Sequence, residues 1–209
     1  MMVVSPRAAC FLVAFGLILG LTSHSAFADS ARFQPESLAA DCLKAWERGL
    51  SPCDTTPDSY VIIRKSTRAL AWCESGRLVK VFETGLGFSP DGDKEREGDG
   101  RTPIGTFYIP RRIPSSQFHR AFLISYPDVE DANLAMSRGS ISQWQHRSIV
   151  QAQSECREPP QQTSLGGLIE IHGQGGKSDW TLGCIAIDNT AIDKLWRTLD
   201  VGDSVVILP

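Results

Sequence analysis

Cys184 and His172 are the two residues in this sequence whose types and spacing could carry covalent chemistry. Eleven residues separate them. A thiolate is a strong nucleophile and an imidazole can take the thiol proton, so the pair suits attack on a carbonyl carbon. Gly183, immediately before the cysteine, would let the backbone approach a substrate closely. The N–H groups of Gly183 and Cys184 could then hold the oxyanion of a tetrahedral intermediate.

Two neighbouring strands would have to position this pair. The apolar runs 168–171 and 184–187 predict short strands, and the glycine-rich segment between them predicts a turn. A histidine that ends the first strand and a cysteine that starts the second can then meet at one edge of a sheet. A small buried cysteine and a structural histidine would give the same pattern. The two residues alone therefore leave a catalytic and a structural interpretation open.

The first residues of the chain have the pattern of a secretory signal peptide. Arg7 precedes an apolar run from Ala8 to Leu21, and Ala26-Phe27-Ala28 follows as a small-x-small cleavage site. The alternative is an uncleaved membrane anchor, but this run is shorter than the roughly 20 residues that span a bilayer. We therefore expect an exported protein of the periplasm or cell envelope, without an integral membrane segment after cleavage.

Five cysteines would remain in the exported chain: Cys42, Cys53, Cys73, Cys156 and Cys184. An oxidising compartment favours paired cysteines, and an odd number leaves at least one thiol over or paired between chains. If Cys184 is the free thiol, the other four allow three pairings. We favour Cys42 with Cys53, which bracket a short segment, and then Cys73 with Cys156, although the sequence leaves the pairing open.

Charge and motif content disfavour several other classes of protein. The formal net charge is −3, and no basic stripe or alternation of aromatic and basic residues suggests nucleic-acid binding. The sequence has no HExxH motif, which disfavours a zinc peptidase. It also has no CxxC spacing, which disfavours a structural zinc site.

The remaining pattern predicts many short strands and a few helices. We expect a helix over 36–50 that is capped by Ser37, one or two helices within 131–153, and a helix that Asn189 caps. The expected strands are 60–63, 69–73, 78–82, 106–109, 122–125 and 204–208, and residues 89–101 should form an exposed loop. This predicts an α+β fold that is mainly β, a sandwich of short mixed strands with flanking helices.

Several motifs together resemble the L,D-transpeptidase catalytic domain family. His172-Gly173, followed by Thr181-Leu182-Gly183-Cys184-Ile185, resembles its HG pair and its Ser/Thr-x-Gly-Cys nucleophile turn. The segment 98–108 resembles its TPxGxF region, and Gly98-Asp99-Gly100-Arg101, Ser125-Tyr126-Pro127 and Asp179-Trp180-Thr181 look like its murein-processing subgroup. The resemblance runs from about Ser59 to Pro209. Together with the predicted signal peptide, it divides the chain into a signal peptide over 1–28, a helical extension over 29–58 and a catalytic domain over 59–209.

The resemblance implies roles for individual residues. Cys184 would be the nucleophile and His172 the general base, with Gly183, Thr181 and Leu182 forming the oxyanion turn. Substrate contacts would come from Gly173, Trp180, Asp179, His119, Arg101 and Tyr126. Leu182 stands where many members have histidine, and Ala186 where many have a substrate-contacting arginine, which puts substrate choice in question.

Alternatives remain open for several of these residues. Thr181 could polarise the site or cap a turn, and the ring of His172 could be oriented by Asp179 or by a backbone carbonyl. His119 could instead be a surface histidine, and Arg101 could brace its loop. Lys94 could meet a substrate carboxylate or be a loop charge in water, and His146 is expected to be solvated.

The implied substrate is the stem tetrapeptide of peptidoglycan. Cys184 would form a thioester at the L-centre of diaminopimelate and release D-alanine, and an amine would then take the acyl group. The acceptor could be a second stem peptide, a D-amino acid or the lysine of a wall-tethered lipoprotein. We expect no cofactor, no metal and a monomer. The alternatives are a cysteine hydrolase of the same fold, which cleaves a wall peptide or a lipoprotein link, and a non-catalytic wall-binding module.

Overall fold

The computed structural model describes residues 34–55 and 58–209, so the predicted signal peptide lies outside the described residues. None of the helices in this part of the chain combines the length and apolarity that crossing a bilayer requires. The elements, in chain order, are α1 (Pro35–Arg48), β1 (Ser59–Arg64), the 3₁₀ turn η1 (Lys65–Thr67), β2 (Ala69–Glu74), β3 (Arg77–Glu83), β4 (Gly105–Tyr108), β5 (Arg111–Ser116), β6 (His119–Leu123), α2 (Val129–Ser137), α3 (Gln143–Ser154), β7 (Glu170–His172), β8 (Ile185–Ala186), α4 (Asn189–Leu195) and β9 (Ser204–Leu208).

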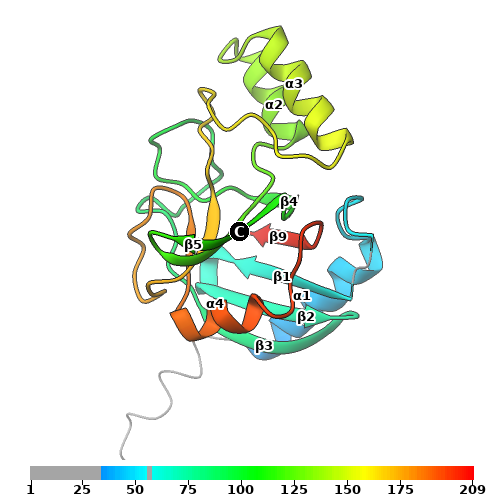
Figure 1. The fold of residues 1–209 in the computed structure, drawn as a ribbon, viewed down its shortest axis with the longest axis vertical. Coiled ribbons are helices and arrows are strands. Elements are labelled where there is room, and N and C mark those ends of the chain that lie inside the picture. The colour runs from blue at the N-terminus through cyan, green and yellow to red at the C-terminus, as the bar shows by residue number, and fades with distance from the viewer. Residues whose placement is uncertain (1–33, 56–57) are drawn as a thin grey trace, which may run out of the picture.

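Two mixed sheets form the body of the protein (Figure 1). The first has the order β3-β2-β1-β9-β4 and the second the order β5-β6-β7-β8. Each contains one parallel pair, β1 with β9 and β7 with β8. One core cluster includes Val61 and Ile63 of the first sheet together with Phe122 and Ile171 of the second. The predicted mainly-β α+β fold with mixed strands is therefore confirmed.

Helix α1 covers the other face of the first sheet. Side chains alternate between the faces of a strand. Tyr60 and Ile62 of β1 therefore point away from the main core and join Leu38 and Cys42 of α1 in a second cluster. The hydroxyl of Tyr60 donates to the carbonyl oxygen of Cys42 at 2.7 Å. This helix thus lies against the sheet that carries the first strand.

The disulfide pairing that we favoured from the sequence is wrong. Cys42 of α1 is bonded to Cys73 of β2, and Cys53 is bonded to Cys156. The first bond joins two elements that meet only because α1 docks on the sheet. Sequence proximity of Cys42 and Cys53 was therefore a poor guide. Among the described residues Cys184 is the free thiol, which is the condition from which the pairing argument started.

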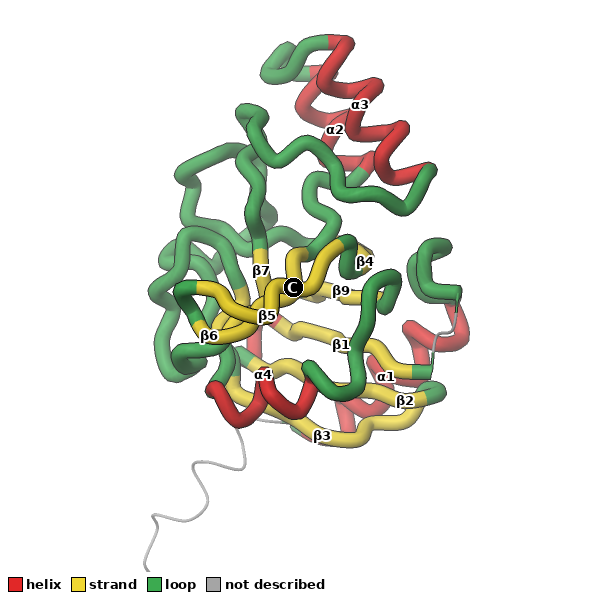
Figure 2. The backbone as a smooth tube through the Cα atoms, in the orientation of Figure 1, coloured by secondary structure: helices red, strands yellow, loops and turns green. Residues whose placement is uncertain are grey.

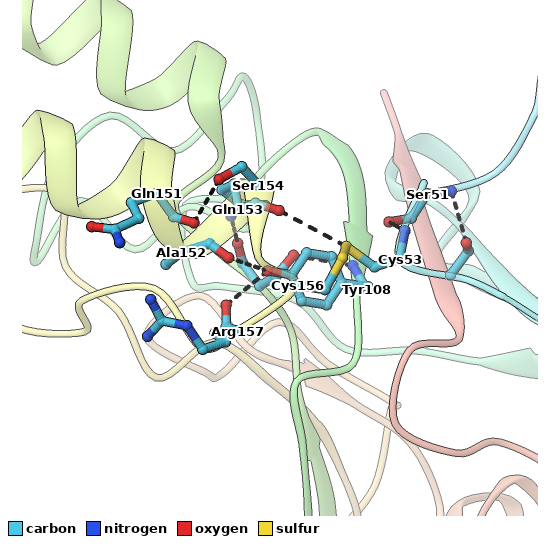
Figure 3. The surroundings of a disulfide bond; sticks show 11 residues. Ser51, Cys53, Tyr108, Gln151, Ala152, Gln153, Ser154, Cys156 and Arg157 are labelled. Atoms are coloured by element: carbon cyan, nitrogen blue, oxygen red, sulfur yellow. Dashed lines mark hydrogen bonds between the residues drawn. A yellow bond between two sulfur atoms is a disulfide. The ribbon is translucent and has the colours of Figure 1, made fainter.

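Helices α2 and α3 form a hairpin that projects beyond the sheets at one end of the molecule (Figure 1). Each begins with a capping box, at Asp128 and at Ser142. The Cys53–Cys156 disulfide fastens the end of α3 to the loop after α1 (Figure 3). Beside it, the hydroxyl of Tyr108 donates to the carbonyl oxygen of Arg157 at 2.7 Å. The hairpin is therefore tied to the body at its base.

Several local predictions were wrong for identifiable reasons. Strand β5 was not predicted, because it contains Pro114 and two arginines; it pairs only with β6, at the edge of its sheet, where proline is tolerated. Ser37 does not cap α1, because its hydroxyl donates back to the carbonyl oxygen of Gln34. Asn189 does not cap α4 either, since Asp188 is the N-cap residue and the Asn189 side chain accepts from the N–H of Gln174.

The segment 89–101 lacks regular structure, as predicted, but part of it is buried. Lys94 is 4% exposed and pairs with Asp99 at 2.9 Å, so of the two alternatives for Lys94 the structure excludes a loop charge in water. The Asp99 carboxylate also accepts from the backbone N–H groups of Glu95, Arg96 and Arg101. Loops surround β7 in this part of the molecule (Figure 2). The hydrogen bonds to Asp99 hold the backbone of the 95–101 loop in one conformation.

Candidate active site

Strands β7 and β8 bring His172 and Cys184 to neighbouring positions. The two strands are parallel, and His172 is the partner of Ala186, two residues beyond Cys184. The thiol lies at the start of β7, where it donates to the carbonyl oxygen of Leu168 at 3.5 Å. Because the strands are parallel, His172 ends β7 whereas Cys184 lies beside the start of β7. The two residues are therefore diagonal neighbours two register positions apart, and they do not meet at one edge as expected from the sequence.

Thr181 shapes the turn that carries the nucleophile. Its hydroxyl donates to the carbonyl oxygen of Cys184 at 2.8 Å and accepts from the N–H of Gly183 at 3.1 Å. Of the two roles considered for Thr181, the structure supports turn capping. The Gly183 N–H is already used, so its expected place in the oxyanion hole is wrong, and the Cys184 N–H becomes the candidate donor.

Gly183 has no space for a side chain. Its φ is 137°, and a Cβ atom there would lie 2.7 Å from the carbonyl oxygen of Arg101 and 3.0 Å from Cδ1 of Ile169. The turn can therefore lie close to the 101 segment only because residue 183 is glycine. From the sequence, Gly183 was expected to let the backbone approach a substrate. In the structure, the missing side chain makes room for Arg101 and Ile169 of the protein itself.

The segment 85–88 holds the nucleophile turn from the other side. Gly85 and Ala186 exchange two backbone hydrogen bonds, at 2.9 and 2.8 Å. Thr181 donates its N–H to the carbonyl oxygen of Leu86 and accepts from the N–H of Phe88. The hydroxyl of Thr102 accepts from the N–H of Gly87 at 3.0 Å. Through the segment 85–88, these contacts connect the motif that contains Thr102 to the nucleophile turn, which lies far along the chain.

A backbone carbonyl orients the ring of His172. Its Nδ1 lies 2.7 Å from the carbonyl oxygen of Gly173, so Nδ1 carries the hydrogen and Nε2 keeps its lone pair. The ring stacks on Phe118 with centroids 4.5 Å apart, and Trp180 meets it edge-on at 5.6 Å. The tautomer that can act as a general base is thus set by contacts within the protein.

Burial favours the neutral forms of both groups. It raises the pKa of the Cys184 thiol to about 11 and lowers the pKa of His172, despite the opposing effect of the Gly173 carbonyl. Within the described residues the thiol bonds to Leu168 and not to the imidazole. At neutral pH the resting pair is therefore a thiol and a neutral imidazole, which favours general-base catalysis over a preformed ion pair.

Asp179 organises the backbone and does not touch the ring of His172. The Nε atom of Arg68 donates to both of its carboxylate oxygens, at 3.1 and 2.9 Å. The same carboxylate accepts from the N–H of Leu86 at 2.9 Å. Asp179 therefore links the residue that precedes β2 to the segment that holds the nucleophile turn. Sequence reasoning missed Arg68, because nothing in its local pattern marks it.

The structure shows contacts within the protein for the other predicted site residues. Tyr126 is fully buried and donates to the carbonyl oxygen of Leu165, so its expected substrate contact is wrong. Arg101 donates to the carbonyl oxygen of Asp93, which is a loop-bracing contact. His119 is exposed and pairs with Asp193 at 2.9 Å, and its predicted substrate contact stays a prediction. His146 is partly exposed and contacts Asn133 at 2.7 Å.

Gly173, expected to contact substrate, is itself buried. A Cβ there would lie 2.4 Å from Oδ1 of Asn189 and 2.8 Å from the carbonyl oxygen of Phe118, so the glycine allows the strand end to pack. From the sequence, His119 was singled out but its neighbour Phe118 was not. The aromatic ring, and not the histidine, makes the contact with His172.

Apolar side chains are exposed on the segments around the thiol. Trp180 and Leu182, on the turn itself, are 40% and 74% exposed. Phe88 and Leu168, on the two segments that bond to the turn and the thiol, are 55% and 56% exposed. Large apolar side chains that gather on one exposed surface mark a binding region. This surface could hold the aliphatic part of a peptide.

A comparison with protein-family models identifies the family of this chain. The family model described as YkuD, the L,D-transpeptidase catalytic domain, matches residues 58–207. No curated protein matches the sequence.

Three solved structures illustrate the structural similarity. An L,D-transpeptidase from Mycobacterium smegmatis is 11% identical, with 73% of this chain and 59% of that chain covered and a TM-score of 0.43. An L,D-transpeptidase from Xylanimonas cellulosilytica is 18% identical, with coverages of 78% and 67% and a TM-score of 0.43. Bd1075 from Bdellovibrio bacteriovorus is 19% identical, with coverages of 76% and 50% and a TM-score of 0.48. This chain spans between half and two thirds of the length of these solved chains.

Proposed function

Because this chain belongs to the YkuD family of L,D-transpeptidase catalytic domains, we propose that it is a peptidoglycan L,D-transpeptidase that uses Cys184 as nucleophile and His172 as general base. The observation that carries the proposal is the free thiol of Cys184 beside the strand of a correctly oriented histidine. The four other cysteines of the described residues form two disulfides, which supports export to the periplasm or cell envelope.

The first half-reaction forms a thioester. Nε2 of His172 takes the thiol proton while the sulfur attacks the carbonyl carbon at the L-centre of diaminopimelate. The carbonyl electrons move to the oxygen, which the N–H of Cys184 stabilises. When this intermediate collapses, the C–N bond breaks and the imidazolium returns the proton to the amine of the departing D-alanine. The thiol must first turn away from the Leu168 carbonyl.

The second half-reaction resolves the thioester. An acceptor amine attacks the acyl carbon and gives a proton to Nε2 of His172. The C–S bond then breaks, and the thiolate recovers the proton from the imidazolium. If water takes the place of the amine, the same steps hydrolyse the thioester. The acceptor therefore decides between transfer and hydrolysis, and we propose transfer to the amine of a second stem peptide.

Product analysis tests the proposal. The mature protein is incubated with purified disaccharide tetrapeptides, and the products are identified by mass. We expect release of D-alanine and formation of a cross-linked dimer, with both absent for Cys184→Ala. A tripeptide product without dimer would assign the hydrolase instead. Identical products from the Cys184→Ala protein would refute the assigned nucleophile.

A further inference from the structure

A polar cavity lies beside the segment that holds the nucleophile turn. Its volume is about 590 Å³. The residues that line it are Ser66, Thr67, Arg68, Thr84, Lys177, Ser178 and Asp179. None of them takes a proton or forms a bond in the steps described above.

The cavity adjoins the catalytic turn through backbone contacts. Thr84 precedes Gly85, which pairs with Ala186, two residues beyond Cys184. Paired residues lie about 5 Å apart and strand residues rise about 3.3 Å each, so Thr84 lies on the order of 10 Å from Cys184. The loop that carries Lys177 is pressed against this segment, because a Cβ on Gly176 would lie 2.7 Å from Cα of Thr84. One peptide could therefore reach both the thiol and the cavity.

The cavity has an uncompensated positive charge. Two of its lining residues are cationic and one is anionic. The guanidinium of Arg68 is held by the carboxylate of Asp179, with their side chains 23% and 24% exposed. Lys177 is exposed and forms no ion pair with any residue in 34–55 or 58–209. Its ammonium group therefore remains available to an anion.

A buried hydroxyl adds an unused hydrogen-bonding group. Thr84 is 1% exposed, and its Oγ1 has no hydrogen-bond partner among the described residues. Buried polar atoms are almost always satisfied. The Oγ1 atom is shielded from solvent in this conformation, so an occupant of the cavity would supply its partner once the Thr84 side chain rotates toward the cavity. The exposed hydroxyl of Ser178, beside Lys177, provides a further donor.

We propose that this cavity binds a carboxylate of the wall peptide that is remote from the reacting carbonyl. The inference rests on the proposed function for the identity of its ligand, because a diaminopimelate stem peptide carries carboxylates beyond the bond that breaks. Lys177 supplies the charge, and the hydroxyl groups supply hydrogen bonds. Arg68 and Asp179 fix the wall of the cavity and at the same time the segment behind the nucleophile turn.

Direct binding tests this inference without any need for turnover. The affinities of the tetrapeptide and of its analogue with carboxamides in place of the side carboxylates are measured by calorimetry on Cys184→Ala protein. An exposed ion pair contributes up to about 1 kcal/mol, so we expect the acid to bind up to about fivefold more tightly. Lys177→Ala in the same background should abolish this preference, and Lys177→Arg should keep it. Lys44→Ala, at an exposed lysine of α1, is the matched control and should leave it unchanged.

The outcomes separate this inference from the proposed function. Equal affinity for acid and amide, or a preference that survives in Lys177→Ala, overturns the carboxylate site. Wild-type protein that releases no D-alanine from the acid peptide overturns the proposed function, but the calorimetric comparison can still be interpreted. Alkylation of Cys184 by neutral iodoacetamide should proceed equally in wild-type and Lys177→Ala protein, because the lysine lies outside the thiol's surroundings.

Discussion

Replacing Gly183 by alanine should displace the nucleophile turn. The residue has a φ of 137°, and its new Cβ would lie 2.7 Å from the carbonyl oxygen of Arg101 and 3.0 Å from Cδ1 of Ile169. Backbone strain at such an angle costs about 1–3 kcal/mol, and overpacking costs a further 1–3 kcal/mol. We therefore expect Gly183→Ala to lower the free energy of unfolding by about 2–6 kcal/mol.

Gly98→Ala is the matched control, because Gly98 also has a positive φ, 76°, but a Cβ atom there would have no neighbour within 4 Å. It should show the strain alone, at about 1–2 kcal/mol, with unchanged turnover. In Gly183→Ala, a shift of about 1 Å in the position of the thiol should lower kcat on the order of a hundredfold.

Urea unfolding and D-alanine release measure the two effects separately. The free energy of unfolding should fall further in Gly183→Ala than in Gly98→Ala, and only Gly183→Ala should lose kcat. If the two variants unfold alike and Gly183→Ala turns over like the wild type, the turn does not depend on the close contact with Arg101, and the geometry assigned to it is wrong.

Other contacts lead to three more expectations. Arg68→Ala should lower the free energy of unfolding by about 1 kcal/mol, since its ion pair with Asp179 is partly exposed, and should lower kcat severalfold; unchanged kcat would contradict its role in positioning the turn. Cys73→Ala should destabilise the protein by about 3–4 kcal/mol in urea, because the lost bond spans 31 residues, and peptide mapping should find Cys42 joined to Cys73 in the wild type; a Cys42 peptide joined to another cysteine would contradict this. Iodoacetamide alkylation of Cys184 should still be accelerating at pH 9, because burial raises its pKa to about 11 and only the thiolate reacts; a plateau that begins near pH 6 would indicate a resting ion pair instead.

Local patterns in the sequence were sufficient for much of the fold. Short apolar runs such as Tyr60–Ile63 located most strands, since a strand buried on both faces is a continuous apolar segment. The two glycine-flanked residues His172 and Cys184 located the candidate site, because their strands are close in sequence and adjacent in the sheet.

Contacts between distant segments could not be predicted in this way. Arg68 and Asp179 are 111 residues apart, and their ion pair depends on how two loops meet. The Cys42–Cys73 bond depends on the docking of α1 on β2. The choice between a carbonyl and a carboxylate as the partner of His172 depends on the course of a single turn. Each of these is a property of the packed chain and leaves no local pattern in the sequence.

Detection of the acyl-enzyme is the most direct test of Cys184 as the nucleophile. The wild-type protein is mixed with the tetrapeptide, quenched in acid within milliseconds to seconds, and analysed by intact mass and peptide mapping. We predict a thioester on Cys184 with the mass of the substrate less D-alanine, and its formation should be about a thousandfold slower in His172→Ala, the scale at which loss of a general base acts. An acyl group mapped to any other residue, or D-alanine release at the wild-type rate from Cys184→Ala protein, would contradict this mechanism.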